Sequence, residues 1–385
     1  MHDKNLTPVQ RNRMLDALHN YTERLGTPVS IQYLDLGTKI VRLINYSDAF
    51  TPYIEDQLAY VLKDGATHYD ATLVVWQEQD MLDLQLALYR AYNPRLYFQK
   101  RAARARQAQT GEKLDPVLRI SDEDVLHHHP LVEINRDAGT ASIWDYRTNT
   151  HYYSVSKLDP EELIKKGHLF VRSLSRIIKS PKSNLVHGAV VGVKNTGVLF
   201  CGIGYRGKST FSVNALLHGF EYVSDDYISL GRQDGILRAW PIYSIITLSP
   251  AVWQFMRKRL RAEFLSNNAR KDKYVFSIAE YHKQFVSGYP VRLCMYPRFV
   301  QDAEPSIEKG DRAKALEEFV FSSLRPVGDA EDVETIVKLY SFVCDLPFYR
   351  INLTSNLDKN TRCLRDFLEH FNEEQKGEDS CPVIN

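Results

Sequence analysis

Residues 202–209 place three glycines, a lysine and a serine at a spacing that suits phosphate binding. They read Gly-Ile-Gly-Tyr-Arg-Gly-Lys-Ser, which matches the pattern G-x-x-x-x-G-K-S. Glycines let the backbone wrap so that successive N–H groups point at phosphate oxygens. An apolar run precedes the segment and a helix-prone run follows it, which is the context that this motif needs. The predicted nucleotide-binding residues are Gly202, Ile203, Gly204, Tyr205, Arg206, Gly207, Lys208, Ser209 and Thr210.

Two of these residues have side chains with specific chemistry. Lys208 can reach the β- and γ-phosphates of a nucleotide, and the Ser209 hydroxyl can join the ligands of Mg²⁺. A helix that begins near Lys208 would direct the positive end of its dipole at the same phosphates. The segment therefore predicts a nucleoside triphosphate and Mg²⁺ as ligands. A glycine-rich structural turn is the alternative interpretation.

An aspartate pair follows about one helix later. Residues 220–224 read as a β-strand that ends at Asp225 and Asp226. If this strand pairs directly beside the strand that leads into the loop, both carboxylates reach the bound phosphates. One could hold Mg²⁺, directly or through water, while the other takes the proton of an attacking hydroxyl. Adjacent aspartates also occur as helix caps and turns, which is the competing interpretation.

Several basic and histidine residues are further candidates. Cations near the transferring phosphoryl group would stabilise its charge, and the candidates are Arg206, Arg238, Lys271, Lys273 and Arg292. Arg206 is favoured because it lies within the loop. A basic cluster at residues 100–106 (Lys100, Arg101, Arg104, Arg106) is typical of a solvated helix face, with a docking surface for an acidic partner or phosphate as the alternative. The histidines at 127–129 indicate an exposed loop.

Composition excludes several classes of protein. The 385 residues include 49 Lys+Arg and 48 Asp+Glu, and the net charge of +1 argues against a dedicated nucleic-acid binder. No run approaches 18 apolar residues, so no membrane span is expected, and the N-terminus lacks the apolar core of a signal peptide. The five cysteines are far apart with no CxxC pair, which favours reduced thiols and a cytoplasmic location.

The pattern of elements predicts an α/β protein with two domains. An α+β domain at 1–158 would recognise the substrate, and a P-loop kinase domain would occupy 159–385. Strands are expected at 28–36, 39–45, 71–77, 116–120, 131–135, 141–146, 151–155, 184–193, 197–202, 220–224, 290–300 and 347–355. Helices are expected from Pro8 to Gly26 with Thr7 as its cap, from Thr51, within 82–110, and at 159–179, 311–324, 332–346 and 360–371.

Three segments in a fixed order resemble the HPr kinase/phosphorylase family and its HPr kinase-related relatives. They are His-Gly at 187–188 with the strand after it, the loop at 202–209, and the strand that ends in Asp225-Asp226. The likeness covers residues 185–250 well and extends more weakly to about 300. It implies a PEP-carboxykinase-like P-loop fold and ATP-dependent phosphorylation of a hydroxyl, usually serine. On the matching positions it implies that Asp225 is the general base, Asp226 lies near the metal, and His187 lies near the transferred phosphate.

The sequence differs from the motifs of this family at several positions, and these differences limit which reaction and acceptor are expected. This chain has Gly204-Tyr205 where the family usually has Ser-Gly, and Ser209-Thr210 where Ser-Glu is common. It has no counterpart of the family's Arg-Gly-x-Gly-Ile signature, so the reverse reaction and HPr itself as acceptor are not expected. His187 taken alone would more often be a core histidine.

The expected function is an ATP- and Mg²⁺-dependent kinase that acts on a hydroxyl of a protein, peptide or small molecule. A nucleotide-binding regulatory or scaffold protein is the alternative, followed by a PEP-carboxykinase-like or NTP-hydrolysing enzyme. The family often forms oligomers, so a homo-oligomer is a candidate state.

Overall fold

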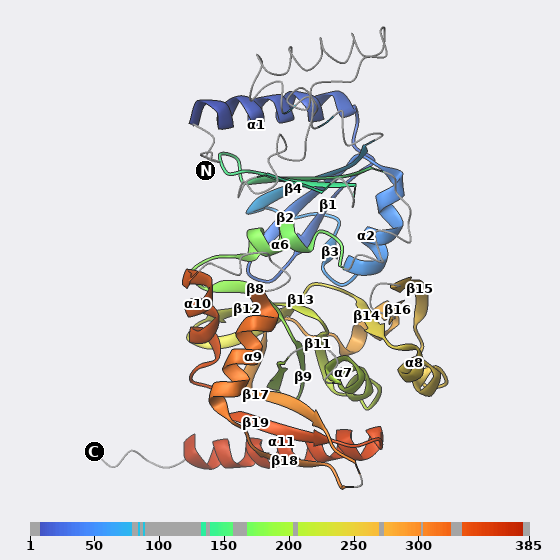
Figure 1. Ribbon diagram of the computed structural model, residues 1–385, viewed down its shortest axis with the longest axis vertical. Coiled ribbons are helices and arrows are strands. Elements are labelled where there is room, and N and C mark those ends of the chain that lie inside the picture. The colour runs from blue at the N-terminus through green and yellow to red at the C-terminus, as the bar shows by residue number, and fades with distance from the viewer. Residues whose placement is uncertain are drawn as a thin grey trace, which may run out of the picture. The chain divides into compact units, whose positions relative to one another are not determined.

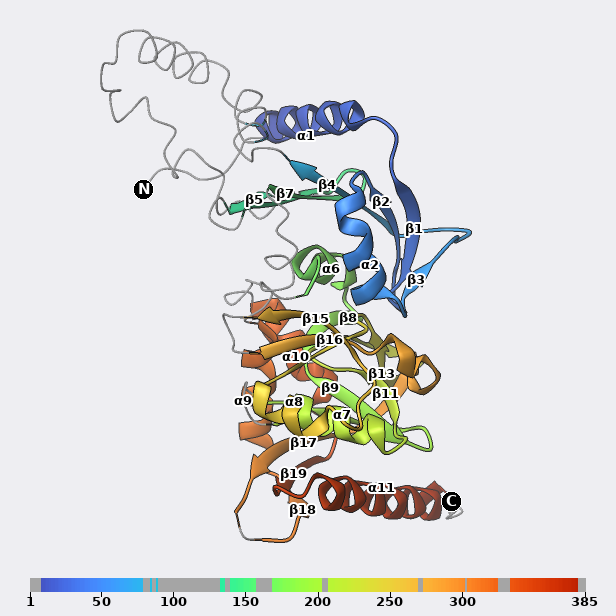
Figure 2. The ribbon, with the colours of Figure 1, turned by 90° about the vertical axis from the view of Figure 1, so that its right-hand side faces the viewer.

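The computed structural model describes residues 8–78, 84, 88, 132–135, 139–156, 168–202, 207–268, 273–301, 303–324 and 333–379. This is a mixed α/β protein whose described strands form three sheets (Figures 1 and 2). The chain divides into two compact units: Met1–Tyr33, Val41–Pro52 and Asp64–Asp159 make one, and Leu34–Ile40, Tyr53–Lys63 and Pro160–Asn385 make the other. The second unit thus includes two segments from before residue 64. None of the described helices is both long and apolar enough to cross a membrane.

The elements before residue 157 build the first sheet, whose strand order is β3-β1-β2-β4-β7-β6-β5. Strand β4 runs parallel to β2 and β7, while β6 runs antiparallel to β5 and β7. The element bounds are α1 Pro8–Thr22, η1 Glu23–Leu25, β1 Ser30–Asp35, β2 Ile40–Asn45, η2 Asp48–Phe50, α2 Thr51–Leu58, β3 Leu62–Lys63, β4 Ala71–Glu78, β5 Val132–Asn135, β6 Thr140–Asp145 and β7 Thr150–Ser156.

The first helix covers this sheet with the apolar face that its sequence predicts. Leu15 and Leu18 are fully buried and pack in one cluster with Trp76 of β4 and Ile143 of β6. The strands predicted at 28–36, 39–45, 71–77, 131–135, 141–146 and 151–155 are confirmed. Outside the described residues lie Thr7, the strand at 116–120, the cluster at 100–106, the histidines at 127–129 and all of 82–110 except Leu84 and Leu88.

The second unit is built on a nine-stranded sheet. Its main path is β11-β9-β10-β17-β13-β12-β8, with β19 paired to β17 and β18, and a small sheet β14-β16-β15 accompanies it. The bounds are α6 Val171–Ile178, β8 Ser183–His187, β9 Ala189–Val193, β10 Thr196–Phe200, α7 Lys208–Leu217, β11 Glu221–Ser224, β12 Tyr227–Gln233, β13 Ile236–Pro241, β14 Ile245–Leu248, α8 Pro250–Met256, β15 Glu263–Asn268, β16 Lys273–Ser277, η5 Ala279–Gln284, β17 Tyr289–Phe299, β18 Ser306–Lys309, α9 Arg312–Leu324, α10 Val333–Val343, β19 Phe348–Leu353 and α11 Leu357–Asp379.

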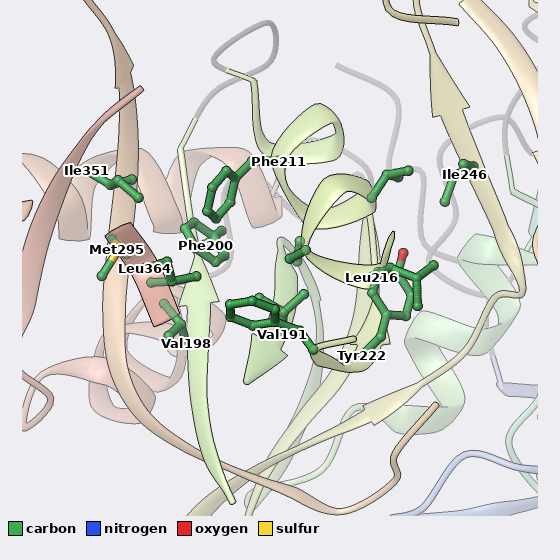
Figure 3. Packing of buried hydrophobic residues seen from close by; sticks show 14 of the residues in the cluster. Val191, Val198, Phe200, Phe211, Leu216, Tyr222, Ile246, Met295, Ile351 and Leu364 are labelled. Carbon is green, nitrogen blue, oxygen red and sulfur yellow. The ribbon is translucent and has the colours of Figure 1, made fainter. Parts of the chain in front are cut away.

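Side chains of the central strands alternate between two cores, as the two-residue period of a strand requires. On β10, Val198 and Phe200 join a cluster with Leu216 of α7 and Leu364 of α11 (Figure 3). The residue between them, Leu199, joins the opposite cluster, with helices α9 and α10. The sheet is therefore covered on both faces, with α9 and α10 on one side and α7 on the other (Figure 1). The predicted C-terminal strands and helices are confirmed.

Candidate functional site

The strand and helix that flank residues 202–207 are those that the motif predicts. Strand β10 ends at Phe200, and α7 begins at Lys208 directly after Gly207. Gly202 and Gly207 have φ angles of +123° and +89°, which residues with a Cβ rarely adopt. The ring of Phe200 packs against Phe211 in the first turn of α7, with centroids 5.2 Å apart (Figure 3). This contact ties the two ends of the loop together, while Ile203, Gly204, Tyr205 and Arg206 lie outside the described residues.

Lys208 lies inside this corner of the protein. Its side chain is 6% exposed, and Nζ donates a hydrogen bond to the carbonyl oxygen of Gly202 at 2.6 Å. Burial lowers the pKa of Lys208, whereas the carboxylates of Asp226 and Asp225 act to raise it. The ammonium is thus held between the beginning of the loop and the aspartate pair.

The aspartate pair lies at a bend in a long two-stranded ribbon. Strands β8 and β9 are separated only by Gly188, and β11 and β12 only by Asp225-Asp226. β8 pairs antiparallel with β12, and β9 pairs antiparallel with β11, so the two interruptions face each other. The Gly188 N–H donates to the carbonyl oxygen of Asp226 at 2.9 Å. The single strand predicted for 184–193 is therefore wrong, because the chain turns from one part of the sheet to another at Gly188.

Glycine is needed at this bend. A Cβ on Gly188 would lie 2.9 Å from the carbonyl oxygen of Phe200 and 3.1 Å from Cδ1 of Leu199. Both atoms belong to the end of β10, so the bend packs directly on the strand that leads into the loop. The close approach brings His187, Asp225 and Asp226 to the same end of the sheet as the loop.

Strand β11 does not pair directly with β10, because β9 lies between them. β9 and β10 form a hairpin whose two-residue turn, Lys194-Asn195, has positive φ at both positions. This turn type matches the twist of a β-hairpin, so β9 pairs directly with β10. Since β9 is antiparallel to both neighbours, β11 runs in the same direction as β10. The carboxyl ends of these strands therefore still meet at one edge.

The two aspartates have opposite electrostatic surroundings. Asp225 is 1% exposed, and neither carboxylate oxygen has a hydrogen-bond partner by geometry among the described residues. Burial, and then the charge of Asp226, raise the pKa of Asp225 to about 7, against the opposing effects of Ser209, Lys273 and Lys208. Burial would also raise the pKa of Asp226, but a hydrogen bond from His187 and the charges of His168, His187 and Lys273 hold it well below its usual value.

The partners of Asp226 approach both of its oxygens. His187 Nε2 lies 3.5 Å from Oδ1, and His168 Nε2 lies 3.7 Å from Oδ2. The Thr247 hydroxyl donates to Oδ2 at 3.2 Å. His187 is one of the predicted site residues, whereas His168 and Thr247 are not. Neither belongs to a recognisable motif, and only their positions in the folded chain associate them with the pair.

The sequence predicts a helix at 159–179, so it gives no indication that His168 contacts the aspartate pair. In the structure α6 begins only at Val171, and residues 168–170 form a turn in which Phe170 has a φ of +59°. The prediction is wrong at these three residues. The buried Leu169 accounts for the turn, because its N–H donates to Gln57 Oε1 at 2.9 Å and its carbonyl accepts from the Tyr243 hydroxyl at 2.7 Å. These tertiary bonds replace those of a continuous helix.

The basic residues predicted to stabilise the transferring phosphoryl group differ in whether they lie near the aspartate pair. The charge of Lys273, at the start of β16, acts on both aspartates. Arg238 instead donates to the carbonyl oxygen of Gly288 at 2.7 Å, and Arg292 is exposed on β17. Lys271 and Arg206 lie outside the described residues. Among the predicted phosphoryl clamps whose structure is described, Lys273 is therefore the one associated with the pair.

The described residues of the site could supply at most a small share of the ligands of a divalent ion. Among the described residues, no group of three or more His, Cys, Asp and Glu side chains gathers to hold a metal. Mg²⁺ usually takes one or two protein carboxylates together with phosphate oxygens and water. The buried oxygens of Asp225 have no close hydrogen-bond donor among the described residues, so they could accept a cation or a hydroxyl donor that arrives with a ligand.

Comparisons with known proteins leave the family unassigned. No protein-family model matches the chain, and no curated protein matches it in sequence. Among solved structures, the Hpr(Ser) kinase/phosphatase from Coxiella burnetii aligns with 14% identity and a TM-score of 0.28, over 51% of this chain and 95% of that chain. A TM-score of this size does not establish a common fold. The function is therefore inferred from the geometry of the site.

Proposed function

We propose that this protein is an ATP- and Mg²⁺-dependent kinase that transfers the γ-phosphoryl group to a serine or similar hydroxyl. One observation carries the proposal: Lys208 at the start of α7, the Asp225-Asp226 pair and His187 converge at one end of the sheet. A nucleotide-binding module would need the loop and the lysine. It would not need a buried carboxyl group beside them whose oxygens have no close hydrogen-bond donor among the described residues, because burying such a group is costly.

In the proposed reaction the two aspartates have different tasks. Asp225 accepts the proton of the acceptor hydroxyl as that oxygen forms its bond to the γ-phosphorus, and the bridging oxygen leaves with ADP. Asp226, held ionised by its imidazole partners, would hold Mg²⁺ together with the Ser209 hydroxyl. Mg²⁺ bound with ATP would supply charge neutralisation for the phosphates. Lys208 and Lys273 add positive charge near the transferring group.

The assignment of base and metal partner follows the surroundings of each carboxylate. Two neighbouring acids whose pKa values are driven apart can divide acid–base and electrostatic work. Asp225, with a pKa of about 7, can both accept and release a proton near neutral pH. Asp226 remains charged and so suits the electrostatic role.

Transfer of radiolabelled phosphate tests the proposal. Purified protein is incubated with γ-labelled ATP, Mg²⁺ and either cell-lysate proteins or a panel of small hydroxyl compounds. Asp225→Asn should lower transfer roughly 100-fold or more while ATP affinity stays within about threefold. Asp234→Asn is the matched control, because Asp234 is an exposed aspartate in the β12–β13 turn.

The outcomes separate the competing functions. Transfer by Asp225→Asn at the rate of the parent protein would contradict the base assignment. Tight ATP binding without labelling of any acceptor would favour the nucleotide-binding regulatory protein instead. Release of inorganic phosphate without an acceptor would favour an NTP-hydrolysing enzyme.

A further inference from the structure

His168 contacts the aspartate pair from a part of the chain outside the three motifs. Its imidazole is 5% exposed and approaches Asp226 Oδ2, while His187 approaches Oδ1. One imidazole therefore faces each oxygen of the same carboxylate. Helix α6 separates His168 from strand β8, of which His187 is the last residue.

Packing fixes the orientation of the His168 ring. The ring meets Tyr227 and Tyr243 edge-on, with centroids 4.6 Å and 4.5 Å away. The next residue, Leu169, is bonded through its backbone to Gln57 and to the Tyr243 hydroxyl, as described above. A histidine on the surface loses rotamer freedom when it pairs with an acid. The His168 ring is already confined by its packing, so its contact with Asp226 costs little further side-chain entropy.

The backbone conformation and the mostly buried carboxylate of Asp226 both require stabilising contacts. It has a φ of +66°, a left-handed conformation that is uncommon for residues other than glycine. Its carboxylate is 15% exposed, so an ionised state must be compensated by partners. Two imidazoles and the Thr247 hydroxyl supply that compensation and leave little freedom for rotation of the carboxylate.

We propose that His168 is a positioning residue for the Asp226 carboxylate, acting as the second arm of a two-histidine clamp whose first arm is His187. His168 acts on the reaction through Asp226 and does not itself contact the reacting atoms. The inference rests on the proposed function for its effect on catalysis, but the clamp itself is a property of the protein without ligands.

A kinetic comparison tests the effect on the reaction. His168→Leu removes the N–H group and should lower kcat roughly 10- to 100-fold, with the KM for ATP changed by less than about threefold. His168→Gln keeps a side-chain N–H at similar reach and should recover a large part of kcat. Equal losses in both variants would overturn the inference, because packing alone would then explain the role. His218→Gln is the matched control, since His218 lies at the opposite end of α7 from Lys208.

A double-mutant cycle tests the clamp without any kinase activity. Unfolding by urea is measured in EDTA, without nucleotide, for the parent, His168→Gln, Asp226→Asn and the double variant. A clamp predicts that the two substitutions are coupled by at least about threefold in the unfolding equilibrium constant. Effects that simply multiply would overturn the inference, whatever the result of the transfer assay. Coupling without phosphoryl transfer would instead preserve the clamp and contradict the proposed function.

Tyr243→Phe gives a further test if His168→Leu does not fold. It removes the hydroxyl that holds the Leu169 carbonyl and leaves the ring beside His168 in place. The inference predicts a smaller fall in kcat than for His168→Leu, in the same direction and with an unchanged KM for ATP. An unchanged kcat would mean that the turn does not position Asp226.

Discussion

Replacing Asp225 by asparagine should stabilise the protein without ligands at alkaline pH much more than at acidic pH. The folded protein holds the Asp225 proton with a pKa of about 7, whereas the ordinary value for aspartate is 3.8. The contribution of this group to folding is therefore fully present below pH 3.8 and is lost as the pH rises through about 7. The asparagine side chain of the variant has no such proton to lose, so the variant does not undergo this loss of stability.

The size of the effect follows from the width of that pH window. Each pKa unit corresponds to about 1.4 kcal/mol, so the full loss for the parent protein is about 4 kcal/mol. Between pH 5 and pH 7 the loss is about 3 kcal/mol, because roughly two units of the window lie in that range. A buried amide without partners costs about 1–3 kcal/mol, but this cost is the same at every pH. It cancels when the advantage of the variant is compared between two pH values.

Urea unfolding at pH 5, 6, 7 and 8 in EDTA measures this difference directly. The free energy of unfolding of Asp225→Asn, relative to the parent, should increase by about 3 kcal/mol from pH 5 to pH 8. Asp234→Asn should show no such trend, because Asp234 is exposed. A relative stability of Asp225→Asn that stays constant across this range would refute the reasoning. The pKa of Asp225 would then lie near the ordinary value for aspartate, and burial would not raise it.

Three further predictions address the loop, the bend and the cysteine between β10 and the loop. Lys208→Met should lower ATP affinity by roughly tenfold or more in a titration with a fluorescent analogue, while the exposed-lysine variant Lys194→Met should bind like the parent, since Lys194 pairs with Glu369 on the surface. Gly188→Ala should destabilise the fold by about 1–3 kcal/mol in urea, because its Cβ would lie 2.9 Å from a carbonyl oxygen of β10; an unfolding midpoint equal to that of the parent would mean that the bend relaxes freely. Cys201 should resist iodoacetamide in the folded protein at pH 8, since burial raises the pKa of its thiol to about 12; mass spectrometry that finds it modified as fast as in urea would contradict the buried placement.

Much of the architecture could be predicted from the sequence because its determinants are local. The two-residue turn at Lys194-Asn195, the helix after Gly207 and the apolar alternation of β10 each depend on residues within a few positions of one another. Such signals are read from the short-range sterics of glycine and asparagine and from the period of burial. The same kind of signal predicts the helix at 159–179. This prediction is wrong at His168–Phe170, because tertiary hydrogen bonds of Leu169 with Gln57 and Tyr243 override helical propensity.

The residues that could do the chemistry can be recognised from the amino-acid sequence, because the loop with Lys208 and Ser209, the Asp225-Asp226 pair and His187 all lie within about 40 residues of one another. The different surroundings of these residues depend on the folded structure. The insertion of β9 beside β10, the approach of His168 and Thr247 to Asp226, and the absence of such partners around Asp225 among the described residues all involve residues far apart in the chain. A pKa depends on burial and on neighbouring charges, which are set by long-range packing, so two adjacent and identical side chains acquire opposite properties.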